Sequence, residues 1–283
     1  MSGGTLLTVR LALQRCQAAG LERLEAQLLL GELLQCDRSW LISHDDDRLS
    51  NLDAARFEDW LAQRLDQVPL AYLSGRKEFH GLRLRVSRDT LVPRPDTEVL
   101  VDWALEVLAA QMQAGRAEPR VIDMGTGSGA IALAIKHRCP AAQVAALDFS
   151  IGALAVARAN AQDLSLAAEF IHGSWWQALP GRRFDLIVSN PPYIAGQDPH
   201  LPALRHEPLS ALTPGGDGLA DLRILIDGAP AHLTPGGTLL LEHGWDQVPA
   251  AAQLLGQAGF IDLDCRKDLA GMQRASGGRM PLG

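Results

Sequence analysis

The sequence has few cysteines and no long apolar segment, and each shortage excludes a class of protein. Its four cysteines are Cys16, Cys36, Cys139 and Cys265. Their scattered spacing indicates a reducing compartment and predicts neither a disulfide framework nor a metal site. No apolar run approaches the roughly 18 to 20 residues that span a bilayer, and the first residues lack a basic segment followed by an apolar core. We therefore expect a cytoplasmic protein without membrane contact.

Positive charge is also in short supply. The chain has 26 Lys plus Arg against 33 Asp plus Glu, a net charge of -7 and a pI near 5.6. A broad nucleic-acid-binding surface is usually basic, so this balance argues against one. Residues 1–75 carry 7 Arg and 11 acidic residues, a net of -4, whereas residues 76–95 carry 6 basic and 2 acidic residues, a net of +4. This basic cluster is either a solvated strand face or a contact with an anionic partner.

The first third of the chain predicts a small helical domain and a hairpin. Leucines recur at helical spacing from Thr5 to about Asp66, with Ser50 as an N-cap. We predict a helical substrate-docking domain over residues 1–75; the alternative is a domain that only stabilises its neighbour. Residues 76–95 alternate at period two around Gly81, which predicts a β-hairpin linker. Asp96 or Thr97 is then expected to cap a helix running through about residue 114.

After Pro119 the sequence alternates strand and helix signals, which predicts an α/β fold with a mostly parallel, doubly wound sheet over residues 96–283. The predicted strands lie near residues 120–124, 143–147, 168–172, 184–189, 238–242 and 260–265, with a last short one near 279–282. The predicted helices lie near residues 129–138, 151–163, 219–233 and 246–258.

A glycine-rich turn follows the first predicted strand of this sheet. It consists of Gly125, Thr126, Gly127, Ser128 and Gly129. Glycines at alternate positions let the backbone approach a ligand closely. Asp148 ends the next strand 19 residues after the last of these glycines, where a carboxylate can accept both hydroxyls of a ribose. The pair predicts a nucleoside-containing cofactor. A helix cap is the alternative role for Asp148, and NAD the alternative cofactor, although no His or Lys is placed for hydride chemistry.

A rigid polar turn follows the buried strand predicted at residues 184–189. This tetrad consists of Asn190, Pro191, Pro192 and Tyr193. Two prolines fix the backbone, so the asparagine amide and the tyrosine ring are held in place. The amide carbonyl and nearby backbone carbonyls could accept hydrogen bonds from a substrate NH2 group while the ring covers its flat face. The alternative is a proline-rich turn after a core strand.

Together these features resemble the class I S-adenosylmethionine-dependent methyltransferases, in which the tetrad is shared by enzymes that methylate adenine N6 and by those that methylate glutamine amides. Sequence before the sheet separates the two groups, because YLSG at residues 72–75, FHGL at 79–82 and VPRPDTE at 92–98 resemble the PrmC (HemK) family. HEP at 206–208, GGDGL at 215–219 and EHG at 242–244 match it as well. That family consists of N5-glutamine methyltransferases that act on peptide chain release factors.

The resemblance implies the roles of the site residues. It places S-adenosylmethionine against residues 125–129, Asp148 and Trp175, with Asn190 near both cofactor and substrate. The implied partners are class 1 peptide chain release factors, presenting the glutamine of a Gly-Gly-Gln loop, with no direct contact to nucleic acid. One departure is Ser174, at a position that is often acidic in the family. Arg94 and Glu207 are expected either to shape the pocket or to form a structural ion pair.

Two competing hypotheses remain from the residues alone. An adenine-N6 nucleic-acid methyltransferase should carry a basic recognition domain, which residues 1–75 are not. A non-catalytic cofactor-binding module would not need a rigid tetrad. We therefore expect an enzyme that methylates a glutamine side chain.

Overall fold

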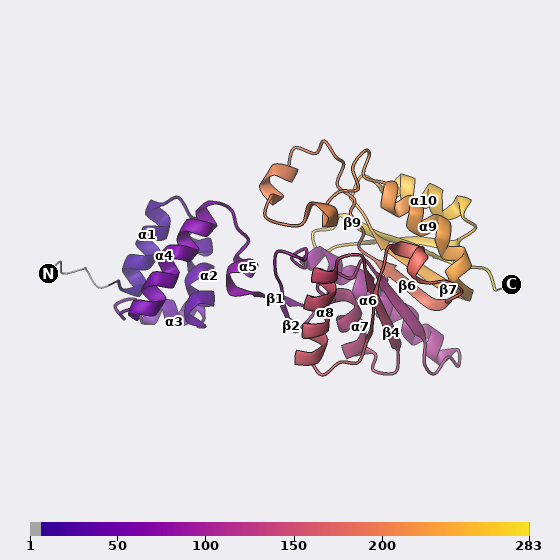
Figure 1. The fold of residues 1–283 in the computed structure, drawn as a ribbon, viewed down its shortest axis with the longest axis horizontal. Helices are drawn as coiled ribbons and strands as arrows, with labels where there is room; N and C mark the ends of the chain where they lie inside the picture. The colour runs from indigo at the N-terminus through magenta and orange to yellow at the C-terminus, as the bar shows by residue number, and fades with distance from the viewer. Residues whose placement is uncertain (1–6, 283) are drawn as a thin grey trace. The chain divides into compact units, whose positions relative to one another are not determined.

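The computed structural model describes residues 7–282, and its contacts divide the chain into two compact units, Met1–Gly75 and Arg76–Gly283 (Figure 1). Residues 1–6, including Thr5 and Leu6 at the start of the predicted helical stretch, lie outside the described part. Each unit has its own hydrophobic core. No helix among residues 7–282 is long and apolar enough to cross a membrane.

The smaller unit is helical, as its leucine periodicity predicts. Its helices are α1 (Val9–Ala18), α2 (Arg23–Leu34), α3 (Arg38–Ser43), α4 (Asn51–Leu65) and α5 (Leu70–Ser74). Their apolar faces enclose a core that includes Leu29, Leu30 and Phe57, each 0% exposed. The hydroxyl of Ser50 accepts a hydrogen bond from the backbone N–H of Asp53 at 3.0 Å, so the predicted N-cap is confirmed.

The larger unit begins with the predicted hairpin. Strands β1 (Arg76–Phe79) and β2 (Leu82–Arg85) pair antiparallel. His80 and Gly81 form the two-residue turn with φ of 49° and 80°, the left-handed conformations that such a turn requires. The guanidinium of Arg85 pairs with Asp163 at 2.5 Å, so part of the hairpin's positive charge is neutralised within the same unit.

A seven-stranded sheet forms the centre of the larger unit. Its strands are β3 (Arg120–Met124), β4 (Gln143–Asp148), β5 (Glu169–His172), β6 (Phe184–Ser189), β7 (Leu233–Glu242), β8 (Ile261–Lys267) and β9 (Gln273–Arg279). The helices are α6 (Glu98–Gln113), α7 (Ala130–Arg138), α8 (Ile151–Asp163), α9 (Ala220–His232) and α10 (Val248–Gln257). The strand order is β5-β4-β3-β6-β7-β9-β8, parallel from β5 to β7 and antiparallel at β9 and β8. The predicted doubly wound sheet is confirmed.

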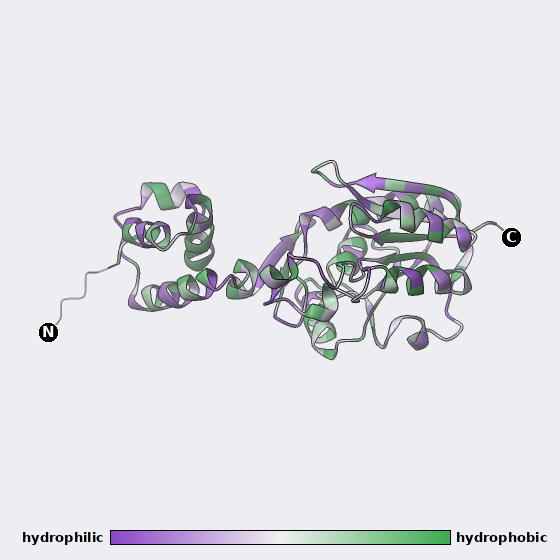
Figure 2. Ribbon diagram, turned by 90° about the horizontal axis from the view of Figure 1, so that it is seen from above, coloured by the Kyte–Doolittle hydropathy of each residue, from purple (hydrophilic) through white to green (hydrophobic). Residues whose placement is uncertain are grey.

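Both faces of the sheet are covered, because the central strands are apolar on both sides. In β6, Leu186 and Val188 pack in the core that includes α6 and α7, whereas Ile187 between them packs in the core that includes α9 and α10. Figure 2 shows the central strands as hydrophobic ribbon. Burial on both faces makes these strands continuous apolar runs, and it leaves their carboxyl ends as the edge where polar side chains gather.

One local prediction was wrong, and a second was correct in position only. The last strand lies at Gln273–Arg279 and not at residues 279–282. Its sequence shows no apolar alternation because Gly277 leaves room for neighbours, and a Cβ there would lie 2.5 Å from the Leu240 side chain. Thr97 is the N-cap residue of α6, but its side chain makes no capping hydrogen bond because a short 3-10 turn, Pro95–Thr97, leads into the helix.

Candidate active site

The predicted site residues meet where the strand order of the sheet reverses. From β3 the chain proceeds outward to β4 and β5, then returns to β6 on the other side of β3. The glycine-rich turn leaves the carboxyl end of β3, and the tetrad leaves the carboxyl end of the neighbouring β6. Ligands of open α/β sheets bind in the crevice at such a switch point.

The glycine-rich turn wraps tightly at the end of β3. Gly125, Gly127 and Gly129 have φ of 74°, 56° and 83°, which other residues rarely adopt. A Cβ on Gly129 would lie 3.1 Å from Leu133 and 3.2 Å from Ala157, so this glycine also allows close packing on α8. The side chain of Thr126 turns inward and donates to Asp123 at 2.6 Å. Ser128 is buried, which leaves backbone rather than side chains facing the crevice.

Asp148 lies beside this turn with its carboxylate fixed by backbone. Its Oδ2 accepts from the N–H of Gly127 at 2.8 Å, and its Oδ1 accepts from the N–H of Ser150 at 2.8 Å. Burial raises the pKa of Asp148, and these backbone hydrogen bonds oppose that increase. Each oxygen of a carboxylate has a further lone pair, so the side chain can still accept two hydrogen bonds from a ligand.

A pocket of about 360 Å³ opens beside these residues. Gly125, Gly127, Asp148 and Trp175 all line it. The ring of Trp175 packs against the Gly125 backbone, and its Nε1 donates to Oδ1 of Asp221 at 3.2 Å. A pocket of this volume, lined by both polar and apolar residues, is typical of a small-molecule site. Ser174, at the position that the resemblance expects to be acidic, lines the same pocket with a hydroxyl.

The tetrad separates this pocket from a second, smaller cavity. Pro192 lines the larger pocket, whereas Asn190, Pro191 and Tyr193 line a cavity of about 90 Å³. Leu91 and Ala211 line both cavities. The two spaces therefore adjoin, with the tetrad as their common boundary.

The backbone of the tetrad is held from the chain that follows it. The carbonyl of Tyr193 accepts from Nε2 of Gln247 at 3.0 Å. Gly218 passes so close that a Cβ on it would lie 2.3 Å from this same carbonyl oxygen. The tetrad is thus rigid through its neighbours as well as through its prolines.

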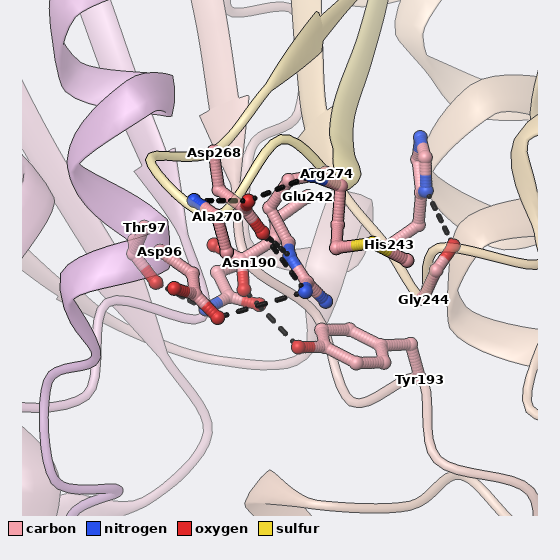
Figure 3. Close-up of polar contacts among 11 residues, drawn as sticks. Asp96, Thr97, Asn190, Tyr193, Glu242, His243, Gly244, Asp268, Ala270 and Arg274 are labelled. Carbon is pink, nitrogen blue, oxygen red and sulfur yellow. Dashed lines mark hydrogen bonds and ion pairs between the residues drawn. The ribbon is translucent and has the colours of Figure 1, made fainter.

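The side chains of the tetrad enter a polar network, drawn in Figure 3. Nδ2 of Asn190 donates to Oγ1 of Thr97 at 3.2 Å. The hydroxyl of Tyr193 donates to Oε1 of Glu242, the last residue of β7, at 3.2 Å. Burial raises the pKa of Glu242 to about 7, and it also raises the pKa of the Tyr193 hydroxyl. Asn190 uses its NH2 group inside the protein, which leaves its carbonyl oxygen for a ligand.

Arg94 and Glu207 form an ion pair at the rim of the smaller cavity. Their closest atoms lie 2.5 Å apart, and the second oxygen of Glu207 accepts from the N–H of Val92 at 3.0 Å. Glu207 is buried, whereas Arg94 lines the cavity. The pair holds the segment before α6 against the loop that follows the tetrad.

The sequence predicted several residues that line the two cavities, among them Gly125, Asp148 and Asn190, but it gave no site role to three others at the site. Thr97 was assigned to a helix cap, Glu242 was noted within a matching motif without a role, and Asp221 was not noted at all. The signal for Glu242 was an acid at the end of an apolar strand next to the tetrad strand. Within residues 7–282 no cluster of three His, Cys, Asp or Glu side chains could hold a metal ion.

Two family models match the sequence, one in each unit. The PrmC N-terminal domain matches residues 8–75, and the Methyltransferase small domain matches residues 97–219.

Similar proteins match over nearly the whole chain. A release factor glutamine methyltransferase of Bordetella pertussis is 50% identical and covers 92% of this chain and 95% of its own length. A release factor glutamine methyltransferase of Xylella fastidiosa is 49% identical, and the match covers 96% of this chain and 98% of that protein. One of Escherichia coli is 38% identical, covering 96% and 97%.

Solved structures resemble the chain in fold. A methyltransferase from Pyrococcus furiosus gives a TM-score of 0.53 at 19% identity, covering 79% of this chain and 99% of that one. The hMettl16 catalytic domain, solved in complex with a MAT2A 3′UTR hairpin, gives 0.57 at 13% identity and covers 83% and 82%. Identities this low support the class I methyltransferase fold alone.

Proposed function

Because this chain belongs to the family of release factor glutamine methyltransferases, we propose that its two adjoining cavities hold S-adenosylmethionine and a substrate glutamine. The enzyme transfers a methyl group to the side-chain amide nitrogen (N5) of the glutamine in the Gly-Gly-Gln loop of a peptide chain release factor. Such a substrate places the protein in the cytoplasm, where translation terminates.

The larger pocket fits S-adenosylmethionine. Its glycines leave backbone exposed at Gly125 and Gly127, and Asp148 has two lone pairs that are free for ribose hydroxyls. The indole of Trp175 offers a flat face for adenine, and Asp221 beside it offers an acceptor for the adenine amino group in a chain where residue 174 is serine. When bound, this cofactor supplies an electrophilic methyl group on a positively charged sulfur.

The smaller cavity fits a primary amide. An amide nitrogen is a poor nucleophile because its lone pair is delocalised into the carbonyl, so the protein must fix its direction and favour electron density on nitrogen. The carbonyl oxygen of Asn190 can accept one hydrogen from the substrate NH2, and backbone carbonyls of the tetrad can accept the other. The contact of Asn190 Nδ2 with Thr97 at 3.2 Å is the observation that carries this proposal, because in this orientation the carbonyl oxygen of the asparagine is the end that a ligand can reach.

The size of the cavity favours glutamine over adenine. A volume of about 90 Å³ accommodates roughly six to nine water-sized groups. A glutamine side chain has half as many heavy atoms as an adenine base and fits this space, whereas adenine fills or exceeds it. The net charge of -7 also opposes the phosphate neutralisation that a flipped base requires.

We also propose that the helical unit, residues 1–75, docks the release factor. A protein that presents one glutamine needs a second contact to fix its orientation. The larger unit supplies both cavities and has its own cores, so residues 76–283 alone should bind S-adenosylmethionine. A folded 76–283 fragment that binds the cofactor is expected to lose release-factor methylation; full activity of that fragment would contradict the docking role.

Radiolabelled methyl transfer tests the substrate assignment. Label from S-adenosylmethionine should enter a purified release factor and should be absent when its loop glutamine is replaced by alanine. Duplex and single-stranded DNA and RNA serve as competing substrates at physiological salt. Comparable labelling of any of these nucleic acids would favour the adenine-N6 alternative.

A further inference from the structure

One buried side chain joins the glycine-rich turn to the hairpin that precedes the sheet. Asn160 lies on α8, which packs beside β2 (Figure 1), and it is 1% exposed. Its Oδ1 accepts from the backbone N–H of Arg85, the last residue of β2, at 2.6 Å, and its Nδ2 donates to the Arg85 carbonyl at 3.0 Å. The same Nδ2 donates to the carbonyl of Ser128 at 2.9 Å. Two segments that are distant in the sequence are therefore held by one amide group.

The three hydrogen bonds allow the Asn160 amide a single orientation. Its NH2 group has two hydrogens, and the carbonyls of Arg85 and Ser128 accept both. A flipped amide would turn its oxygen toward these two carbonyl oxygens and its NH2 group toward the Arg85 N–H. Because each hydrogen bond holds only over a narrow range of distances, the amide fixes how far Arg85 and Ser128 lie from each other.

Two walls of the larger pocket continue from the segments that Asn160 holds. The glycine-rich turn, to which Ser128 belongs, forms one wall. Residues 88–91, which begin three residues after Arg85, form another. Asn160 itself does not line the pocket, so it acts on the pocket only through these two walls.

The face of α8 that carries Asn160 supports the glycine-rich turn. Ala153, Ala157 and Asn160 recur at the i, i+4, i+7 spacing of one helix face. Ala153 lines the pocket, and Ala157 packs against Gly129 of the turn. Asparagine is a poorer helix former than alanine, so helix formation gives no reason for it at the third position. Its three hydrogen bonds supply that reason.

The first turn of α8 contacts the other wall. A Cβ on Gly152 would lie 2.8 Å from Cγ of Asp89, one of the residues 88–91. This wall is compact, because the N–H of Thr90 donates to the Ser87 carbonyl at 3.0 Å. Helix α8 thus supports both walls, and Asn160 is a polar link between them.

We propose that Asn160 is a positioning residue for cofactor binding, which sets the separation of the glycine-rich turn from residues 88–91 before S-adenosylmethionine enters. A pocket whose walls are already in place loses less conformational freedom on binding, so its affinity is higher. An asparagine that only stabilised the end of β2 would need its contacts with Arg85 and not the one with Ser128. The inference rests on the proposed function, because it takes S-adenosylmethionine as the occupant of the larger pocket.

Calorimetry with S-adenosylmethionine tests the role of Asn160. Asn160→Ala removes all three hydrogen bonds, so the Kd should rise by about tenfold, by analogy with residues that support metal ligands, whose loss costs about 10- to 100-fold in affinity. The KM for S-adenosylmethionine should rise by a similar factor, whereas kcat at saturating cofactor and the KM for a release factor should stay near wild type. A residue that only stabilised the fold would lower the melting temperature and leave the cofactor Kd unchanged.

A second variant, Asn160→Asp, has almost the same shape. It keeps the acceptor for the Arg85 N–H but turns an oxygen toward the two carbonyls that the NH2 group contacted. Above neutral pH, the cofactor Kd should therefore rise at least as much as in Asn160→Ala. As the pH falls and the carboxyl gains a proton, it can donate one hydrogen bond, so the ratio of its Kd to the wild-type Kd should decrease.

Asp163→Ala is the matched control. Asp163 lies on the same helix, and its exposed carboxylate pairs with the guanidinium of the same Arg85 at 2.5 Å. Removing this carboxylate frees the Arg85 side chain but leaves the backbone of Arg85 in contact with Asn160. The cofactor Kd should stay within about twofold of wild type, because an exposed ion pair contributes little.

Each outcome decides the inference. A folded Asn160→Ala variant with wild-type cofactor affinity would overturn it, as would an equal loss of affinity in Asp163→Ala. If Asn160→Ala does not fold, wild-type affinity of Asn160→Asp above neutral pH overturns it equally. Failure of both variants to fold would assign Asn160 to stability and overturn it too. A wild-type enzyme that fails to bind S-adenosylmethionine would instead overturn the proposed function.

Discussion

The two halves of the site are built in different ways, although both lie at the same edge of one sheet. The half that we propose binds the cofactor, residues 125–129 with Asp148 and Trp175, is mostly backbone made accessible by glycine. The half that we propose binds the substrate, the tetrad with Thr97 and Glu242, consists of side chains from three separate segments joined by hydrogen bonds. In the proposed roles, backbone and one carboxylate would hold the nucleoside of the cofactor, whereas directing a weak nucleophile requires side chains whose donors and acceptors are fixed.

The largest expected effect concerns Asn190. The hydrogen bond from the substrate amide to the Asn190 carbonyl should be strongest in the transition state, when charge changes on the substrate nitrogen. Asn190→Ala should therefore lower kcat by about 100- to 1000-fold. Affinity for S-adenosylmethionine should stay near wild type. Steady-state kinetics on a release factor, with calorimetry of the cofactor, measure both quantities. A near-normal kcat would reject the assignment of Asn190 to the substrate half.

Asp148 should show the reverse pattern. Loss of its hydrogen bonds to the ribose should cost about 1.5 to 3 kcal/mol, so Asp148→Ala should weaken cofactor affinity by roughly 10- to 150-fold. Once the cofactor is saturating, kcat should recover to near the wild-type value. Calorimetry decides the matter: unchanged affinity in a folded variant would mean that Asp148 only secures the backbone of Gly127 and Ser150.

The smallest expected effect is the difference between alanine substitutions at two nearby glycines. Gly216 and Gly218 both have positive φ, 55° and 79°, but a Cβ on Gly216 meets nothing within 4 Å, whereas one on Gly218 meets the Tyr193 carbonyl. Gly216→Ala should cost about 1 to 2 kcal/mol of stability from backbone strain. Gly218→Ala should cost about 1 to 3 kcal/mol more and also lower kcat, because it displaces the tetrad. Equal melting temperatures and activities for the two variants would show that the tetrad tolerates displacement.

The difference between the two halves also explains which site residues can be predicted from the sequence. Strands β3 to β6 and the glycine-rich turn were predicted because apolar periodicity and glycine spacing are local signals. Asp148 was found for the same reason, since it ends one of those strands. Likewise Asn190 directly follows the most apolar strand, and its place at the sheet edge follows from that alone.

The supporting residues could not be predicted, because their roles depend on contacts between distant segments. Thr97 lies 93 residues before Asn190 in the sequence, and its place at the start of a helix made a capping role the natural interpretation. Glu242 lies 49 residues after Tyr193, and its position at the end of an apolar strand does not reveal that its side chain contacts the tetrad. Strand β9 was misplaced because its glycines make room for the side chains of neighbouring segments and give the strand no apolar alternation of its own.

Locating the transferred methyl group tests the central claim most directly. Wild-type enzyme, S-adenosylmethionine and a full-length release factor would be incubated, and the protein analysed by tandem mass spectrometry of the loop peptide. We predict a single added methyl group on the side-chain amide nitrogen of the loop glutamine, with none when that glutamine is replaced by asparagine, whose shorter side chain holds the amide farther from the tetrad. A methyl group on any other residue, or equal modification of the asparagine variant, would contradict the assignment of the smaller cavity to a glutamine amide.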